Sequence, residues 1–152
     1  MTENSRAEQK ATAQAYVNFY EALSPANLGD LEDILSEDVH FIDPFSDIRG
    51  RDHVMGILQK MFDDVDNPKF TILDVAWSER SCYMRWHFNC YFAVLGDWMF
   101  KGMTELRFNA EGKICAHYDY WDSGLHFYAK LPVIGWFVRL VRKKASFKPA
   151  SQ

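Results

Sequence analysis

The stretch Ser81-Cys-Tyr-Met-Arg-Trp-His-Phe-Asn-Cys-Tyr-Phe92 alternates between two kinds of side chain along its length. Successive side chains of a β-strand point to opposite faces of the sheet, so this pattern predicts a strand with two different faces. One face would carry Met84, Trp86, Phe88 and Phe92, and the other would carry Tyr83, Arg85, His87, Asn89 and Tyr91. We expect the apolar face to line the interior of the fold, which leaves Arg85 and His87 for a subunit interface.

Three neighbouring segments have the same strand character, over residues 69–77, 98–108 and 113–121. The stretches between the segments are rich in Gly, Pro, Asn, Asp and Ser, which favour turns. Because these connections are short, we expect an antiparallel meander in which each strand pairs with the next.

The N-terminal half has apolar side chains at helical spacing, which predicts helices over residues 7–23 and 52–62. Between them, Asp30 is the expected N-cap of a short helix that carries Leu31, Ile34 and Leu35. A short strand with Val39, Phe41 and Asp43 on one face follows and ends at Pro44, and residues 44–51 are expected to form a loop.

A last helix is predicted over residues 123–145, kinked at Pro132, with a flexible tail over 146–152. The element order predicts a single α+β domain over residues 1–152 with its core at about 10–128. N-terminal helices would pack on a curved antiparallel sheet to form a cone with one open end, beside the C-terminal helix. Such a cone is a pocket.

The composition supports an apolar pocket. Aromatic residues make up 16% of the 152 residues, as 12 Phe, 7 Tyr and 5 Trp, which exceeds what a core of this size needs. The excess indicates a hollow lined with rings, an apolar subunit interface, or both. We therefore expect a hydrophobic small molecule as ligand and a homodimer as the assembly.

The net charge of −4 argues against nucleic-acid binding, and its distribution is uneven. Residues 1–122 hold 11 Lys and Arg against 21 Asp and Glu, a charge of −10, whereas the remainder has six basic residues and no acidic one. We expect the basic C-terminal segment to cap the cone or pack on a neighbouring subunit rather than lie on a membrane surface. Three cysteines without a CxxC spacing and the absence of an apolar leader after Met1 predict a cytoplasmic protein.

Three segments carry a family resemblance: Leu35-Ser-Glu-Asp-Val-His-Phe-Ile-Asp-Pro44, Ile48-Arg-Gly50 and Leu106-Arg-Phe-Asn-Ala-Glu-Gly-Lys-Ile-Cys-Ala-His-Tyr-Asp-Tyr-Trp-Asp122. In this order and spacing they resemble the nuclear transport factor 2-like superfamily, and within it the ketosteroid isomerase and SnoaL-like polyketide cyclase branch. The superfamily includes isomerases, cyclases, dehydratases, epoxide hydrolases and binding modules, so the resemblance implies a fold without fixing a reaction.

The resemblance implies a site. Asp43 stands at the place of the general base of ketosteroid isomerases. The tyrosine of their oxyanion hole falls on Phe19, with Tyr16 and Tyr20 nearby, and their second donor falls on Thr104. The match also implies that His117, Asp119 and Trp121 point into the cavity. The remaining residues expected to contact a ligand are Phe41, Trp86, Phe88 and Leu106.

The chemistry of these side chains suits proton transfer. Two carboxylates in an apolar hollow, Asp43 and Asp119, could have pKa values pushed apart by their surroundings. His117 shares a strand face with Asp119, and Tyr16 or Tyr20 could donate to a developing enolate. Each residue also has a structural interpretation: Asp43 as a turn acceptor, Asp119 and His117 as a buried pair, and both tyrosines as core.

Two classes of function therefore stay open. The first is a cofactor-independent isomerase, cyclase or dehydratase that acts on a hydrophobic carbonyl compound. The second is a module without catalysis, which either binds a hydrophobic ligand or serves as a homodimeric interaction domain. The five histidines show no metal-ligand spacing, so we predict no metal and no cofactor.

Overall fold

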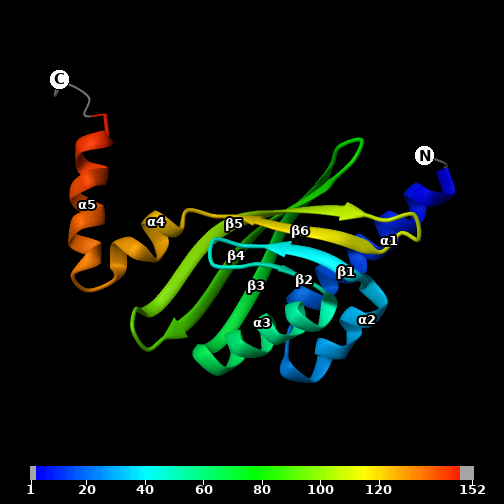
Figure 1. Cartoon of the computed structure of the whole chain (residues 1–152), viewed down its shortest axis with the longest axis horizontal. Coiled ribbons are helices and arrows are strands. Elements are labelled where there is room, and N and C mark those ends of the chain that lie inside the picture. The colour runs from blue at the N-terminus through cyan, green and yellow to red at the C-terminus, as the bar shows by residue number, and fades with distance from the viewer. Residues whose placement is uncertain (1–2, 148–152) are drawn as a thin grey trace.

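A curved six-stranded sheet with the order β2-β1-β6-β5-β4-β3 forms the centre of the structure, a computed structural model that describes residues 3–147 (Figure 1). The strands are β1 (Leu35–Ile42), β2 (Asp47–Arg49), β3 (Asp66–Trp77), β4 (Cys82–Phe92), β5 (Gly96–Phe108) and β6 (Ile114–Tyr120). The predicted α+β architecture, with helices on a curved sheet, is confirmed.

The four strands from β3 to β6 form the predicted meander, in which each strand pairs antiparallel with the next. The expectation of a wholly antiparallel sheet is wrong at one pairing, because β1 pairs with β6 in parallel. Helix α3 and the strands that follow it carry the chain from β1 back to β6, a crossover long enough to allow parallel pairing. The sheet is therefore mixed.

Three helices cover one face of the sheet: α1 (Glu3–Glu21), α2 (Leu31–Ile34) and α3 (Arg51–Asp64) (Figure 1). The apolar stripe of α1, including Ala13, Tyr16 and Tyr20, is buried against the sheet. The residues that meet it from the other elements are also buried: Leu28, Leu31, Ile34, Leu35, Val39, Phe41, Val54, Leu58, Cys82, Met84, Leu106 and Ile114. This cluster fills the space between the helices and the sheet.

Two local predictions in the first half are corrected. Asp30 makes no side-chain cap, because the chain enters α2 directly from a 3-10 helix, η1 (Pro25–Asp30). The start of η1 is instead held by Asn27, whose Oδ1 accepts the Ser24 N–H at 2.8 Å. The predicted loop over 44–51 contains the three-residue strand β2, which pairs with β1 across a tight turn.

The C-terminal segment is not one kinked helix. It consists of α4 (Ser123–His126), a 3-10 turn η2 (Tyr128–Lys130) and α5 (Ile134–Ala145). A γ-turn separates η2 from α5: Val133 has φ 63° and ψ −67°, and the Ile134 N–H donates to the Pro132 carbonyl at 2.7 Å. Such a turn reverses the chain, so α5 leaves the body of the protein (Figure 1).

Within residues 3–147, no helix is both long enough and apolar enough to cross a bilayer. Of the tail predicted to be flexible, residues 148–152 lie outside the described part of the chain.

Candidate functional site

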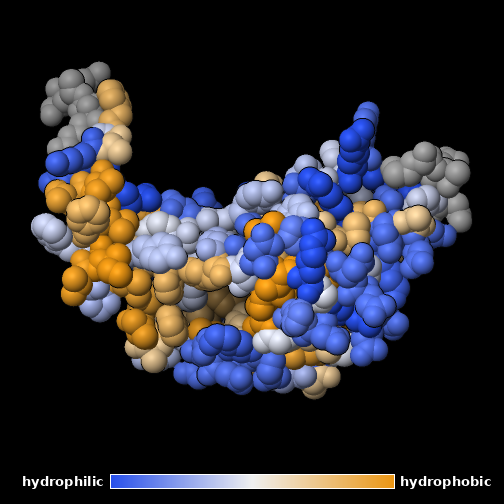
Figure 2. All heavy atoms as spheres, in the orientation of Figure 1, coloured by the Kyte–Doolittle hydropathy of each residue, from blue (hydrophilic) through white to orange (hydrophobic). Residues whose placement is uncertain are grey.

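A pocket of about 440 Å³ opens at the wide end of the cone, between the sheet, α3 and the α4–η2 segment. Its wall is mostly aromatic and aliphatic, and Figure 2 shows a hollow between apolar residues in this part of the surface. The apolar side chains that line it are Phe41, Phe45, Ile57, Leu58, Met61, Val65, Phe70, Trp86, Phe88, Phe92, Trp98, Phe100, Trp121 and Phe127. The volume and lining suit a small apolar ligand.

Asp43 lies on the pocket wall where β1 turns into β2. The Asp43 N–H donates to the Ser46 carbonyl at 2.9 Å, and the Ser46 N–H returns a bond to the Asp43 carbonyl at 3.3 Å, so Pro44 and Phe45 form a two-residue turn. The Asp43 carboxylate accepts the Phe45 N–H at 2.8 Å. The side chain is thus both a turn acceptor and a wall residue.

The electrostatics of Asp43 differ from those of an exposed carboxylate. Burial raises the pKa of Asp43, and the nearby charge of Asp119 acts in the same direction. The N–H groups of Phe45 and Ser46 oppose this shift without cancelling it. Asp43 is therefore a stronger proton acceptor than an ordinary aspartate once it is ionised.

Asp119 reaches the same pocket from β6 and is held from behind by a hydrogen-bonded pair. The Thr104 hydroxyl donates to Asp119 Oδ1 at 2.5 Å, and the Trp86 indole N–H donates to the Thr104 oxygen at 2.8 Å. Thr104 and Trp86 come from β5 and β4, so three adjacent strands fix the position of this carboxylate.

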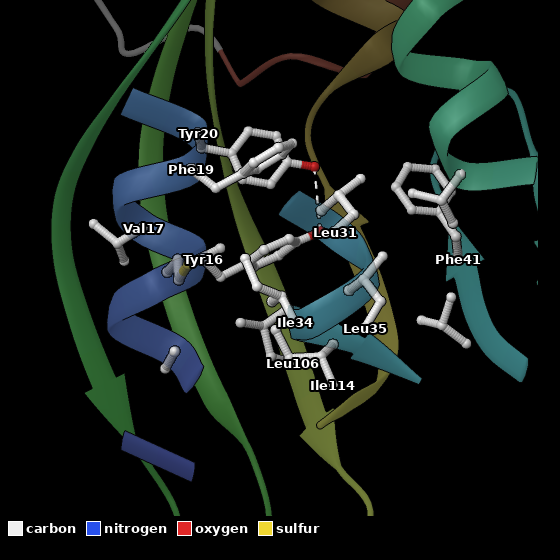
Figure 3. Close-up of a cluster of buried hydrophobic side chains, with 14 of the residues drawn as sticks. Tyr16, Val17, Phe19, Tyr20, Leu31, Ile34, Leu35, Phe41, Leu106 and Ile114 are labelled. Carbon is white, nitrogen blue, oxygen red and sulfur yellow. Dashed lines mark hydrogen bonds between the residues drawn. The ribbon is translucent and has the colours of Figure 1, made fainter. Parts of the chain in front are cut away.

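His117 extends the polar network into the core. Its Nε2 lies 2.9 Å from Asp119 Oδ1, yet the ring N–H does not point at that oxygen well enough for a hydrogen bond. Its Nδ1 lies 2.9 Å from the hydroxyl of Tyr16, which in turn donates to the Tyr20 hydroxyl at 3.4 Å. Figure 3 shows the two tyrosine hydroxyls facing each other among apolar side chains.

Burial raises the pKa of both Tyr16 and Tyr20 well above the usual value, so both phenols keep their protons at any physiological pH. Only Tyr20 also lines the pocket. A small chamber of about 10 Å³ lies beneath it, bounded by Tyr20, Thr104, His117 and Asp119 among apolar residues. The polar network therefore reaches the pocket at two points, Tyr20 and Asp119.

The structure distributes the residues predicted for the site over three places. Those on the pocket wall are Tyr20, Phe41, Asp43, Trp86, Phe88, Asp119 and Trp121. Thr104 and His117 line the small chamber beneath it. The remaining three, Tyr16, Phe19 and Leu106, lie in the hydrophobic core, outside both linings. The side chains of Tyr16 and Phe19 point from α1 toward the sheet, and that of Leu106 points from β5 toward the helices.

Seven aromatic wall residues were not predicted as ligand contacts: Phe45, Phe70, Phe92, Trp98, Phe100, Phe127 and Tyr128. A signal exists for two of them, because Trp98 and Phe100 alternate on β5 as Trp86 and Phe88 do on β4, with Phe88 opposite Phe100 in register. Phe45 directly follows the predicted base and its proline. Its ring packs edge-to-face against Trp121, with the ring centroids 5.5 Å apart.

The first residues of the predicted capping segment lie at the pocket, whereas those of α5 do not line it. Phe127 and Tyr128 line the pocket, whereas Trp136 of α5 lies outside the lining and is 65% exposed. On the sheet, the apolar face of β4 is buried as predicted, and Arg85 and His87 lie on its exposed face. The homodimer interface predicted there stays a prediction.

No cluster of three or more His, Cys, Asp or Glu side chains is arranged to hold a metal ion in the described part of the chain.

A family profile of the SnoaL-like domain matches residues 16–117, two thirds of the sequence. The chain belongs to the SnoaL-like domain family. The match begins within α1 and ends within β6, so it includes Asp43 and Thr104 and stops two residues before Asp119. Comparison with curated proteins gives no significant sequence match.

Solved structures share the fold of this SnoaL-like protein at low sequence identity. A protein from Catenulispora acidiphila with a ketosteroid isomerase-like fold, in complex with trimethylamine, has a TM-score of 0.66 at 18% identity and covers 82% of this chain and 95% of its own. An LEH-like epoxide hydrolase from M. tuberculosis has a TM-score of 0.64 at 18% identity and covers 90% of this chain and 97% of its own. A SnoaL-like polyketide cyclase from Agrobacterium tumefaciens has a TM-score of 0.60 at 18% identity and covers 75% of this chain and 91% of its own.

Proposed function

We propose that this SnoaL-like protein is a cofactor-independent enzyme that moves a proton on a hydrophobic, carbonyl-bearing small molecule. The observation that carries the proposal is the placement of two carboxylates, Asp43 and Asp119, on the wall of one ring-lined pocket. A carboxylate is costly in an apolar hollow unless it is paired or used, and shifted pKa values cluster at functional sites. The other two charged side chains of the wall, Lys60 and Asp64, are exposed and form an ion pair with each other at 2.6 Å.

Asp43 is the proposed base. Its carboxylate removes a proton from the carbon next to the ligand carbonyl, and the electron pair of that C–H bond moves to the carbonyl oxygen as an enolate. The raised pKa of Asp43 makes this proton transfer less uphill than it would be to an ordinary aspartate. When a C=C bond of the ligand is conjugated with the enolate, return of the proton from the Asp43 acid to the far carbon of that bond shifts the double bond and completes an isomerisation with no net charge change.

Tyr20 is the proposed donor to the enolate oxygen. The Tyr16 hydroxyl donates to Tyr20, which leaves the Tyr20 proton free to point into the pocket. That direction requires His117 to donate to Tyr16 through Nδ1, which lies 2.9 Å from the hydroxyl. Tyr16 is thus a positioning residue, and the other ring nitrogen of His117, Nε2, lies 2.9 Å from Asp119 Oδ1.

Exchange of the acidic C–H protons of 2-tetralone for deuterium tests this proposal without knowledge of the natural substrate. Wild-type protein should accelerate the exchange seen by NMR, and Asp43→Asn should remove the acceleration while leaving binding of 2-tetralone unchanged. Tyr20→Phe should slow exchange, since one donor to an oxyanion contributes about 10²–10³-fold in rate. Asp74→Asn on the exposed face of β3 is the matched control and should behave as wild type.

The alternative is a module that binds an apolar ligand without turnover, favoured by the predominance of rings on the pocket wall. In that case 2-tetralone binds, wild type and Asp43→Asn give the same exchange rate, and the enzymatic proposal is wrong. If Asp43→Asn loses binding and exchange equally, Asp43 has a structural role in the turn. That result also contradicts its role as base.

A further inference from the structure

Helix α5 has the opposite orientation to an ordinary surface helix. A helix that packs on a globular body places its apolar stripe against that body. In α5 most apolar side chains point away instead: Val133, which precedes the helix, is 87% exposed, Trp136 65% and Phe137 60%, and Ile134, Leu140 and Val141 are also exposed, whereas Val138 is half-buried. Figure 2 shows these apolar residues gathered on the projecting arm.

The face of α5 toward the body is its polar face. Gly135 is buried there, and a Cβ on it would lie 2.5 Å from the Ala129 carbonyl oxygen. The Arg139 guanidinium donates to the same carbonyl, and Arg142 Nη1 lies 3.1 Å from Asp122 Oδ2. Two arginines and a glycine at spacings of four and three residues define this side of the helix, so the outward direction of the apolar face is fixed by specific contacts.

The charges around the apolar face have one sign. Residues 123–147 contain Lys130, Arg139, Arg142, Lys143 and Lys144 and no acidic residue. Lys143 and Lys144 are exposed at the C-terminal end of α5, beside the apolar face. Packing against the α5 of a second copy would bring like charges together. An anionic lipid surface instead has an acyl-chain region that can bury the aromatic rings and phosphates that can bind the lysines.

We propose that α5 docks this protein on anionic lipid membranes, lying in the interface with Val133, Trp136, Phe137 and Val141 among the acyl chains. The helix spans 12 residues, which is too short to cross a bilayer and suits an interfacial position. Apolar insertion and attraction of the lysines to phosphates act together. The proposal differs from the expectation from sequence that the segment would cap the cone or pack on a second subunit.

The docking surface also borders the pocket. Tyr128, which lines the pocket, belongs to η2, and η2 packs against the start of α5 through Ala129 and Gly135. Phe45 and Tyr128 are partly exposed at the pocket mouth. If the proposed function holds, an apolar ligand dissolved in the bilayer would reach the pocket from the docked face, although lipid docking itself does not depend on any turnover.

Co-sedimentation of the full chain with vesicles tests the docking. We expect binding to phosphatidylcholine vesicles that contain phosphatidylglycerol at low ionic strength, weaker binding at high salt, and little binding to phosphatidylcholine alone. The double variant Trp136→Ser/Phe137→Ser should lose at least about tenfold in partition coefficient. Lys143→Gln/Lys144→Gln should lose about tenfold on anionic vesicles only.

The matched control is Leu73→Ser/Val75→Ser, which removes two apolar side chains that are 40% and 38% exposed on β3, the strand that runs toward the end of the molecule opposite α5 (Figure 1), and should bind as wild type. Thermal melting of all variants checks that they are folded. Absence of wild-type binding to the anionic vesicles overturns the proposal, as does a control that loses as much binding as the Trp136/Phe137 variant. A dimer in sedimentation velocity that the Trp136/Phe137 variant dissociates, without vesicle binding, would assign the face to a second copy instead.

These measurements use vesicles and no substrate. Failure of vesicle binding therefore leaves the exchange experiment untouched, and failure of exchange leaves the docking result untouched.

Discussion

The hydroxyl of Tyr16 lies 2.9 Å from Nδ1 of His117, and this contact joins helix α1 to strand β6 across 101 residues of sequence. Both side chains are buried. The contact lies between the hydrophobic core and the pocket. We therefore expect it both to stabilise the fold and to hold Tyr20 in position.

Tyr16→Phe should destabilise the protein. Removal of the hydroxyl leaves Nδ1 of His117 buried without this partner, and a buried group that loses its hydrogen bond costs about 1–3 kcal/mol in free energy of unfolding. Urea denaturation measures the loss. Tyr91→Phe, at an exposed position on β4, is the control and should change stability by less than about 0.5 kcal/mol. Equal effects of the two substitutions would contradict a structural role for the Tyr16–His117 contact.

Thr104→Val should separate the role of the Thr104 hydroxyl from that of its volume. Valine keeps the shape of the side chain but leaves the Trp86 N–H without an acceptor and Asp119 without a donor. We expect a loss of about 1–3 kcal/mol in free energy of unfolding and slower deuterium exchange into 2-tetralone. Thr104→Ser keeps the hydroxyl and should recover most of the exchange rate. A serine variant as slow as the valine variant would show that the hydroxyl is not the important feature.

Asp43→Asn should gain stability over wild type as the pH rises. Burial raises the pKa of Asp43 above its value in the unfolded chain, so folding favours the protonated acid. The corresponding stabilisation is complete below pH about 4 and is lost as the pH rises through the raised pKa. Asparagine does not ionise, so the difference between the two proteins should grow through that range in urea unfolding at a series of pH values.

Asp43→Ala provides the control for this titration. Alanine also cannot ionise but removes the acceptor for the Phe45 N–H, so its stability should follow the same pH profile at a lower level. A difference between wild type and Asp43→Asn that does not vary with pH would show that Asp43 has the same pKa in the folded and unfolded chain.

Gly102→Ala should be harmful and Gly56→Ala beneficial. A Cβ at Gly102 would lie 2.5 Å from the Trp86 ring and 3.1 Å from Trp121 Cβ, so the Trp86 indole would have to leave its contact with Thr104. A Cβ at Gly56, within α3, meets no atom within 4 Å, and alanine there should stabilise the helix by about 0.4–1 kcal/mol. Thermal melting compares the two variants, and a tolerated Gly102→Ala would refute the tight packing of Trp86.

The elements that could be predicted from sequence are those whose pattern is local. The helical spacing of Ala13, Tyr16 and Tyr20 gives α1, and the alternation of Trp86 and Phe88 gives both β4 and the side of it that lines the pocket. Each pattern is repeated over several residues, so one exception does not hide it.

What could not be predicted depends on contacts between distant segments. The parallel pairing of Phe41 with His117 is decided by a crossover and leaves no mark on either strand alone. The contact of the Trp86 indole with Thr104 likewise joins two strands. The break at Val133 eluded prediction for a different reason: a β-branched residue is rarely found at positive φ, so nothing in its identity indicates a γ-turn.

The turn formed by Pro44 and Phe45 places the proposed base and a ring of the pocket mouth on the same short piece of backbone. The Phe45 N–H also donates a hydrogen bond to the Asp43 carboxylate, and the Pro44 ring fixes the φ angle between the two residues. Neither residue can therefore move without the other. Evolution toward a larger ligand by widening the mouth at Phe45 would displace the carboxylate. Such adaptation is therefore expected on β5, where Trp98 and Phe100 can be exchanged for smaller side chains while the turn is preserved.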